Sequence, residues 1–289
     1  MKKNHRGIPF IKMHGLGNDF IFVFQSSFLP QAPDRETIIR MSDRMRGIGA
    51  DQLIWVEDFS SVTVAKMHIF NRDGTIAKAC GNATRCLAYL YAQKFQQTNV
   101  MIHTPGGGVS CRVHSVEAVS VTIPAPIVGF SAVQGVGSYD YTQSPVSLPS
   151  LYSLVFVQTG NFHMIHVVDS LPDDETLIAY GRWLNSSHPN FPSGINVEFV
   201  KFFDATHGRM RVYERGAECI TQACGTGACA SVFVGAQQGY CDTEVILSLD
   251  GGELRISVKE NNQLEMIGAV CYVFDGIYLD GGEYHARSS

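Results

Sequence analysis

The sequence predicts an α/β protein of the α+β type, built as two pseudo-symmetric domains of like topology. The main observation is an internal repeat: a strand-like run with a turn and then Cys-Gly occurs once after Met67 and again after Met210. In both copies a helix-like run follows the Cys-Gly pair. A chain of 289 residues is long enough for two modest domains. The repeat therefore predicts two similar halves, each placing one cysteine at the start of a helix.

The first half begins with strand-like residues. Residues 11–24 fit a strand, a glycine turn and a second strand, because 20–24 are strongly β-prone. Residues 33–46 fit a helix with Asp34 as its N-cap and Gly47 as its stop. Apolar positions at helical spacing predict a second helix from Cys80. The remaining strands of this half, which we expect to form a sheet around that helix, are predicted at 52–56, 62–70, 100–104, 109–114 and 119–123.

A run of prolines interrupts the pattern at Pro124 and Pro126 and leads into a Gly/Ser-richer stretch. We place the domain boundary here. The predicted domains are residues 1–126 and 127–269, with the C-terminal strand within 270–289 returning to the first domain.

The second half repeats the order of elements. Its helix from Cys224 is apolar nearly all round, so we expect this helix to lie buried within its sheet. A second helix is predicted over 173–184. The strands of this half are predicted at 154–157, 164–168, 195–203, 210–213, 245–249, 254–258 and 264–273.

Composition limits the kinds of molecule that we expect the protein to bind. The formal net charge is −5 and no long basic run is present, which argues against nucleic-acid and anionic-membrane partners and favours a small molecule. The longest apolar run near the N-terminus, residues 20–24, is too short for a signal peptide, and no run approaches the length of a membrane span. The predicted location is the cytoplasm.

The eight cysteines do not form a metal-binding or disulfide pattern. No Cys-x-x-Cys pair is present, and Cys80 and Cys86 lie on different faces of the predicted helix. A reducing compartment also argues against disulfides. We therefore expect no metal site, and we expect most of the cysteines to be small core residues.

Cys80 and Cys224 are the exception. A helix start carries unsatisfied N–H groups and a partial positive charge, which lowers the pKa of a thiol there. Gly81 and Gly225 remove the next side chain, so that a substrate carboxylate can reach those N–H groups. If the two thiols face each other, one can remove a proton from an α-carbon and the other can return a proton to the opposite face. Such inversion needs no cofactor, and no glycine-rich nucleotide fingerprint is present.

Three segments, taken together, resemble the diaminopimelate epimerase family. They are Lys12–Phe20, Asn71–Cys86 and Tyr213–Ala228. The resemblance spans roughly residues 8–282. It implies two domains, each a mostly antiparallel or mixed sheet wrapped around a central helix, with the site in the cleft between them. It also implies a homodimer that interconverts LL- and meso-diaminopimelate without a cofactor, in the synthesis of lysine and peptidoglycan precursors.

The resemblance also assigns roles to individual residues. Cys80 and Cys224 match the acid/base thiols. Glu214 matches a carboxylate near the reacting ammonium group and thiol, and His163 matches a neighbour that tunes a thiol pKa. The residues that match substrate-binding positions are Asn18, Gln52, Asn71, Gly81, Asn82, Asn161, Asn196, Glu214, Arg215, Gly225 and Thr226.

The chain departs from the family pattern at two places. The loop Gly216–Thr221 lacks the family's second glycine, and Phe162 stands where the family has proline. Two alternatives remain open. One is a racemase of the same fold acting on another amino acid, such as histidine or proline. The other is a redox-sensing or structural protein in which Cys80 and Cys224 form a regulatory disulfide.

Overall fold

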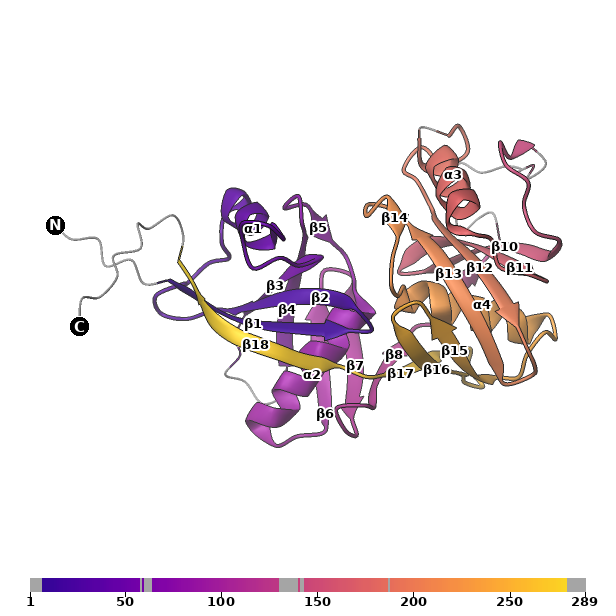
Figure 1. Ribbon diagram of the computed structural model, residues 1–289. Coiled ribbons are helices and arrows are strands. Elements are labelled where there is room, and N and C mark those ends of the chain that lie inside the picture. The colour runs from indigo at the N-terminus through magenta and orange to yellow at the C-terminus, as the bar shows by residue number, and fades with distance from the viewer. Residues whose placement is uncertain are drawn as a thin grey trace.

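The computed structural model describes residues 7–57, 59, 64–129, 140, 143–186 and 188–279. These residues form two lobes that lie side by side, and each lobe holds one long helix against a curved sheet (Figure 1). The strands of the described residues join through hydrogen bonds into one mixed sheet of 18 strands. The predicted fold class, two pseudo-symmetric halves with sheets around central helices, is confirmed.

The first lobe contains two helices and eight strands. The helices are α1 (Arg35–Ser42) and α2 (Gly81–Phe95). The strands are β1 (Ile8–Gly15), β2 (Asn18–Phe24), β3 (Gln52–Glu57), β4 (Val64–Asn71), β5 (Ile76–Ala77), β6 (Asn99–Thr104), β7 (Gly107–Val113) and β8 (Val119–Ile123).

The second lobe repeats that set. The helices are α3 (Asp174–Asn185) and α4 (Gly225–Gln237). The strands are β10 (Leu151–Thr159), β11 (Asn161–Val168), β12 (Asn196–Phe202), β13 (His207–Glu214), β14 (Cys219–Ile220), β15 (Glu244–Leu249), β16 (Gly252–Val258) and β17 (Leu264–Gly268).

The pairing of strands shows the internal symmetry. In the first lobe β1–β2 is a hairpin, β2–β3 is parallel, β3–β4 is antiparallel and β4–β6 is parallel. In the second lobe β10–β11, β11–β12, β12–β13 and β13–β15 repeat these relations in the same order. Equivalent residues of the two copies therefore occupy equivalent places in the two sheets.

Two further strands cross between the lobes. β9 (Ile127–Val128) follows the first lobe and pairs with β10 of the second. β18 (Cys271–Tyr278) follows the second lobe and pairs along its length with β1 of the first, as its yellow ribbon shows (Figure 1). The last strands of the two lobes, β8 and β17, pair with each other. The lobes are thus joined by a mutual exchange of strands.

The two long helices are central because their side chains are apolar and buried. Residues of α2 and α4 belong to one continuous hydrophobic cluster, in which Leu87 and Val232 are fully buried. Separate, smaller clusters lie under α1 and α3. Burial of this area is the main stabilising contribution to the fold.

Two predicted elements differ in the structure. The first helix ends at Ser42, since Asp43 takes an extended conformation and its carboxylate accepts bonds from the N–H groups of Met45 and Arg46, which makes a turn. The predicted strand 264–273 is two strands, β17 and β18, with a break after Gly268. The break is where the chain leaves the second lobe for the first.

Part of the predicted organisation lies outside the described residues. This applies to residues 1–6, 58, 60–63, 130–139, 141–142, 187 and 280–289. Within the described part of the chain, no helix is both long and apolar enough to cross a membrane.

Candidate active site

The two cysteines of the repeat are the N-cap residues of the two central helices. Cys80 precedes α2 and Cys224 precedes α4, both with extended backbone. Each follows a two-residue strand, β5 or β14, that pairs with the end of the preceding long strand. The same local fold therefore delivers a thiol to the first turn of a helix in each lobe.

The two helix starts converge on one side chain, that of Met266 on β17. A Cβ atom added to Gly81 would lie 2.8 Å from Met266 Cε, and one added to Gly225 would lie 2.8 Å from Met266 Sδ. The glycines therefore allow both helix starts to approach the same methionine. We expected these glycines to open the helix starts to a substrate; the structure adds a packing reason for them.

One carboxylate acts on both thiols. Glu214, at the end of β13, raises the pKa of both Cys80 and Cys224 by charge repulsion. Thr221 donates a hydrogen bond of 2.8 Å to Glu214 Oε2 and so holds the carboxylate in place. Burial raises the pKa of Glu214 itself to about 7.

Both thiols have a raised pKa. Burial raises the pKa of Cys80 to about 11, although the N–H groups of Ala83 and Asn82 act in the opposite direction. Burial also raises the pKa of Cys224 well above its ordinary value, against the N–H of Gly227 and the hydroxyl of Thr226. The expectation of a lowered pKa from the helix start is therefore wrong: the N–H groups of the helix start do lower the pKa of each thiol, but desolvation raises it by more.

Cys80 belongs to a chain of hydrogen bonds across the first lobe. Its thiol donates to Asn18 Oδ1 at 3.6 Å, and Asn82 Nδ2 donates to the same oxygen at 3.3 Å. Asn18 Nδ2 donates to Asp51 at 3.0 Å, while Asn82 Oδ1 accepts from the fully buried Arg85 at 2.7 Å. Arg85 and Asp51 thus fix the orientation of both asparagine side chains beside the thiol.

Gln52 and Asn71 lie together by strand register. They are directly opposed on β3 and β4, and Gln52 Nε2 donates to Asn71 Oδ1 at 3.0 Å. Gln52 Oε1 is buried and has no hydrogen-bond partner among the described residues. An unsatisfied buried acceptor is an available site for a ligand donor.

The equivalent polar groups of the second lobe are more dispersed. Asn161 lies half-buried at the start of β11. Asn196 is buried at the start of β12, and its Oδ1 accepts the backbone N–H of Arg215 at 2.8 Å. The Arg215 guanidinium donates to the carbonyl of Ser193 at 3.2 Å. Asn196 therefore holds the backbone at Arg215, in addition to any contact with a ligand.

Cys224 has its own polar neighbours. Its Sγ lies 3.6 Å from Thr226 Oγ1, and the Thr226 carbonyl accepts from Thr159 at 3.1 Å. His163 Nδ1 and Glu198 Oε1 are 2.6 Å apart, and both side chains are fully buried. One nitrogen of His163, one oxygen of Glu198 and the Cys224 sulfur lie within 4.8 Å of one another.

An imidazole nitrogen, a carboxylate oxygen and a thiol sulfur are all common zinc ligands. Burial raises the pKa of Glu198, and the neighbouring imidazole opposes that rise. The short hydrogen bond already joins His163 to Glu198. We therefore interpret the cluster as a group that shares a proton.

Sequence reasoning missed Glu198, Arg85, Asp51 and Met266. A carboxylate inside the apolar run of β12 and an arginine inside the buried helix α2 are signals that could have indicated the first two. Asp51 next to Gln52 and Met266 in a distant strand carry no such signal, because their roles arise from tertiary contacts.

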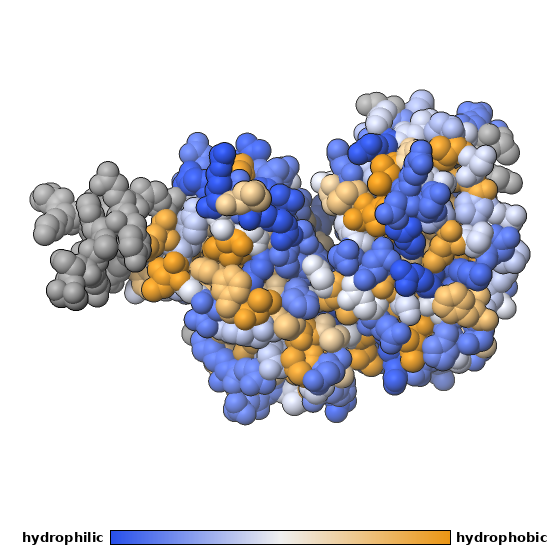
Figure 2. All heavy atoms as spheres, viewed as in Figure 1, coloured by the Kyte–Doolittle hydropathy of each residue, from blue (hydrophilic) through white to orange (hydrophobic). Residues whose placement is uncertain are grey.

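The space-filling view shows a recess between the upper parts of the two lobes (Figure 2). The two short strands β5 and β14, which precede the two cysteines, lie on either side of it (Figure 1). The two repeat copies thus face each other across this recess.

Solved structures share this fold. A hydroxyproline epimerase from Agrobacterium vitis has a TM-score of 0.70 at 14% identity, covering 97% of this chain and 94% of that one. A probable proline racemase from Agrobacterium radiobacter K84 has a TM-score of 0.67 at 14% identity, covering 93% and 92%. The fold is therefore one found among epimerases and racemases.

Sequence comparison identifies the family within this fold. The diaminopimelate epimerase family model matches residues 10–126 and 155–273. A diaminopimelate epimerase of Ectopseudomonas mendocina (strain ymp) is 36% identical over 280 residues, or 93% of this chain and 98% of that protein. One of Microcystis aeruginosa is 36% identical over 281 residues, 94% and 99%. The chain belongs to the diaminopimelate epimerase family.

Proposed function

We propose that this protein is an isomerase that interconverts LL- and meso-2,6-diaminopimelate through Cys80 and Cys224, without a cofactor. The observation that carries the proposal is that the helix starts that follow Cys80 and Cys224 pack against the same methionine, Met266, while Glu214 adds to the raised pKa of both thiols. Two thiols placed in this way can reach opposite faces of one α-carbon. Family membership supports the substrate.

The chemistry follows from the charges at the site. One thiolate removes the α-proton and the other thiol returns a proton to the opposite face. We assign the substrate carboxylate, which gains negative charge as the proton leaves, to the backbone N–H groups at Gly81, Asn82, Gly225 and Thr226. Burial and repulsion by Glu214 both disfavour a thiolate at either cysteine. A substrate ammonium group beside Glu214 would offset that repulsion and favour the thiolate once substrate is bound.

The remaining polar side chains suit the distal amino-acid head of the substrate. Arg215 offers a planar fork of donors for a carboxylate. Amide oxygens such as the unpartnered Gln52 Oε1 can accept from an ammonium group. We assign the distal head to Asn18, Gln52, Asn71, Asn161, Asn196 and Arg215.

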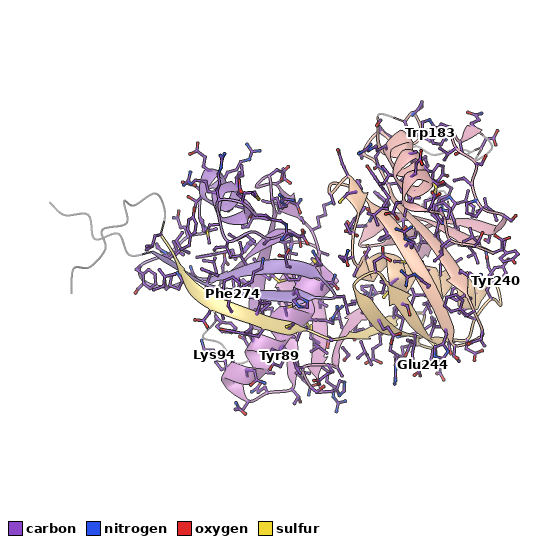
Figure 3. The ribbon with its side chains drawn as sticks, viewed as in Figure 1. Tyr89, Lys94, Trp183, Tyr240, Glu244 and Phe274 are labelled. Carbon is purple, nitrogen blue, oxygen red and sulfur yellow. The ribbon has the colours of Figure 1, made fainter. Side chains whose placement is uncertain are left out.

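The proposal extends to assembly and location. We assign residues 1–126 with 270–289 to one domain and 127–269 to the other; the exchange of β9 and β18 supports this division. We propose a cytoplasmic homodimer joined through β18. Phe274 lies on this strand and is 45% exposed, as are other large apolar side chains beside it (Figure 3). Among the described residues β18 pairs only with β1, so one edge of the strand is free to pair.

The test is α-hydrogen exchange in deuterated water under reducing conditions, with LL-diaminopimelate and a panel including proline, hydroxyproline and histidine. We expect exchange and epimerisation with diaminopimelate alone, and loss of epimerisation in both Cys80→Ala and Cys224→Ala. Turnover of another amino acid in preference would indicate a racemase of different specificity. Full epimerase activity in either alanine variant would refute the two-base assignment. A reduced protein that exchanges nothing would favour the redox role.

A further inference from the structure

Arg85 is a buried cation that the two-thiol reaction does not use. It lies in the second turn of α2 and is fully buried. Its guanidinium has no carboxylate partner among the described residues, and its Nε has no hydrogen-bond partner there. Burial of a charge without a partner of opposite charge is costly, so the presence of this arginine calls for a reason.

The guanidinium lies where the two lobes meet. Its Nη1 donates to Sδ of Met266, on β17 of the second lobe, at 3.5 Å. A Cβ atom added to Gly15, at the end of β1, would lie 3.3 Å from Nη2. One added to Gly268, at the end of β17, would lie 3.2 Å from Cζ. A glycine from each lobe therefore leaves room for the guanidinium between them.

The side-chain amide of Asn82 extends this contact to the second lobe. Arg85 Nη2 donates to Asn82 Oδ1 at 2.7 Å, so the Asn82 Nδ2 is directed away from the guanidinium. This nitrogen donates to Asn18 Oδ1 at 3.3 Å and to the carbonyl oxygen of Ala223, in the second lobe, at 3.4 Å. Asn82 and Ala223 are both buried, so water does not compete for the bond between them.

The Ala223 carbonyl belongs to the peptide group that leads into Cys224. A peptide group is planar, so a hydrogen bond to its oxygen also fixes the direction of the bond between N and Cα of Cys224. The backbone from which the Cys224 thiol projects is thereby tied to the start of α2, which carries Cys80.

The arginine and the asparagine are features of the first lobe alone. The repeat that aligns the two cysteines places Thr226 at the position of Asn82. It places Cys229, a buried thiol, at the position of Arg85. The Thr226 hydroxyl contacts Cys224 of its own lobe. The pair is therefore not a requirement of the repeated fold itself.

We propose that Arg85 is a positioning residue that holds the Asn82 amide so that it binds the Ala223 carbonyl, which sets the place of Cys224 relative to Cys80. This inference rests on the proposed function, because it requires that both thiols act on one α-carbon. Proton transfer slows steeply when the reacting groups are misplaced, so loss of the link should lower kcat. KM should change little, because the backbone N–H groups assigned to the substrate carboxylate remain.

The first experiment compares Arg85→Met, Asn82→Ala and the double variant in the epimerisation of diaminopimelate, each at its own pH optimum so that a shifted thiol pKa does not enter. We expect kcat to fall by about tenfold to a hundredfold in all three, with KM within about twofold of the wild type. The double variant should be no slower than Asn82→Ala, because Arg85 acts through Asn82. Arg112→Met, at an exposed arginine of the same lobe, is the matched control and should change neither constant.

A purely structural role predicts a different result. The double variant has no unpaired guanidinium, so it should be more stable than Asn82→Ala. If activity depended only on stability, kcat would recover together with stability in the double variant. That recovery, or a wild-type kcat in Arg85→Met, would overturn the proposal.

Hydrogen–deuterium exchange followed by mass spectrometry tests the link without substrate. In Arg85→Met and in Asn82→Ala we expect peptides that cover residues 219–226 to exchange about fivefold faster than in the wild type, the scale for loss of one hydrogen bond. Peptides from α3 should not change. Unchanged exchange of residues 219–226 would refute the proposal. If the wild type does not epimerise diaminopimelate, the proposed function is wrong, while this exchange result still decides whether Arg85 and Asn82 hold the segment before Cys224.

A measurement on the wild-type chain does not depend on whether the variants fold. We expect the side-chain amide protons of Asn82 to exchange slowly with water and to show nuclear Overhauser contacts to backbone protons of Cys224. An Asn82 amide that exchanges rapidly and lacks these contacts would show that it does not bind the second lobe, and the proposal would be wrong.

Discussion

Individual charged residues set the charge balance around the two thiols. Burial is the main cause of the raised pKa of both thiols and Glu214 adds to it, whereas Glu198 and His163 lie beside Cys224. In the first lobe, Arg85 is buried without a carboxylate partner among the described residues, and burial lowers the pKa of its guanidinium. The site is thus asymmetric at the residue scale, although the backbone around it is nearly symmetric.

Glu214 predicts a pH dependence of stability. Burial raises its pKa to about 7 in the folded protein from 4.5. Its contribution to stability is therefore complete below about pH 4.5 and is lost as the pH rises through about 7. Glu214→Gln should remove this loss, so the unfolding free energy of the variant relative to the wild type should increase between pH 5 and pH 8 in urea titrations.

Other ionisable groups contribute equally to the unfolding free energy of the wild type and of Glu214→Gln. Burial opposes ionisation of Asp19, but hydrogen bonds from Arg44 and Lys12 hold its pKa well below the usual range. Its contribution is present above the ordinary Asp pKa and is lost only as the pH falls further, and it cancels in the difference. If the difference in unfolding free energy between the wild type and Glu214→Gln were the same at pH 5 and pH 8, the raised pKa of Glu214 would be contradicted.

Asn82 and Arg85 should be energetically coupled. Asn82 Oδ1 accepts a hydrogen bond of 2.7 Å from the buried guanidinium of Arg85, which also donates to Met266 Sδ at 3.5 Å. Asn82→Ala should therefore destabilise the protein by about 2–3 kcal/mol, the scale for hydrogen bonds to charged groups. Adding Arg85→Met removes the unpaired charge, so the double variant should be more stable than Asn82→Ala alone.

Urea unfolding of the four proteins in this cycle measures the coupling free energy. Purely additive effects of the two substitutions would show that the guanidinium does not depend on Asn82.

At the scale of elements, the internal repeat predicts the two central helices but not the short strands or the early end of α1. The helices after Cys80 and Cys224 could be predicted, because apolar spacing and a Cys-Gly start are local signals. The two-residue strands β5 and β14 could not, since two residues carry no periodicity. The early end of α1 depends on the side chain of Asp43, which competes with the helix for backbone N–H groups.

The packing of α3 on β13 depends on a glycine. A Cβ atom added to Gly181 would lie 2.2 Å from Cγ of the buried Tyr213 ring. Alanine favours a helix interior by about 1 kcal/mol over glycine, but overpacking against a fixed ring costs about 1–3 kcal/mol. We therefore expect Gly181→Ala to lower the thermal midpoint of unfolding.

Glu175→Ala, an exposed substitution in the first turn of the same helix, is the control and should change stability by no more than about 0.5 kcal/mol. A more stable Gly181→Ala variant would show that α3 can move away from the sheet.

At the scale of the whole molecule, we propose that two copies meet through the strand β18. Its exposed apolar side chains lie at the edge of the first lobe (Figure 3). Phe274→Glu should therefore convert a dimer to a monomer in sedimentation velocity, because a buried charge at the interface is costly. The control is Phe203→Glu, at a more exposed phenylalanine of the second lobe, which should leave the proposed dimer intact. A wild-type protein that sediments as a monomer would refute the interface.

The sequence by itself determined the two similar halves, the cysteine at the start of each central helix and the family, because repeats, periodicity and motifs are properties of neighbouring residues. Only the tertiary structure decided the exchange of β9 and β18, the meeting of both helix starts on Met266, and the grouping of Glu198 and His163 with Cys224. It also decided the sign of the thiol pKa shifts. A helix start lowers a thiol pKa wherever it occurs, but desolvation depends on every element packed around the sulfur, and no local pattern encodes that sum.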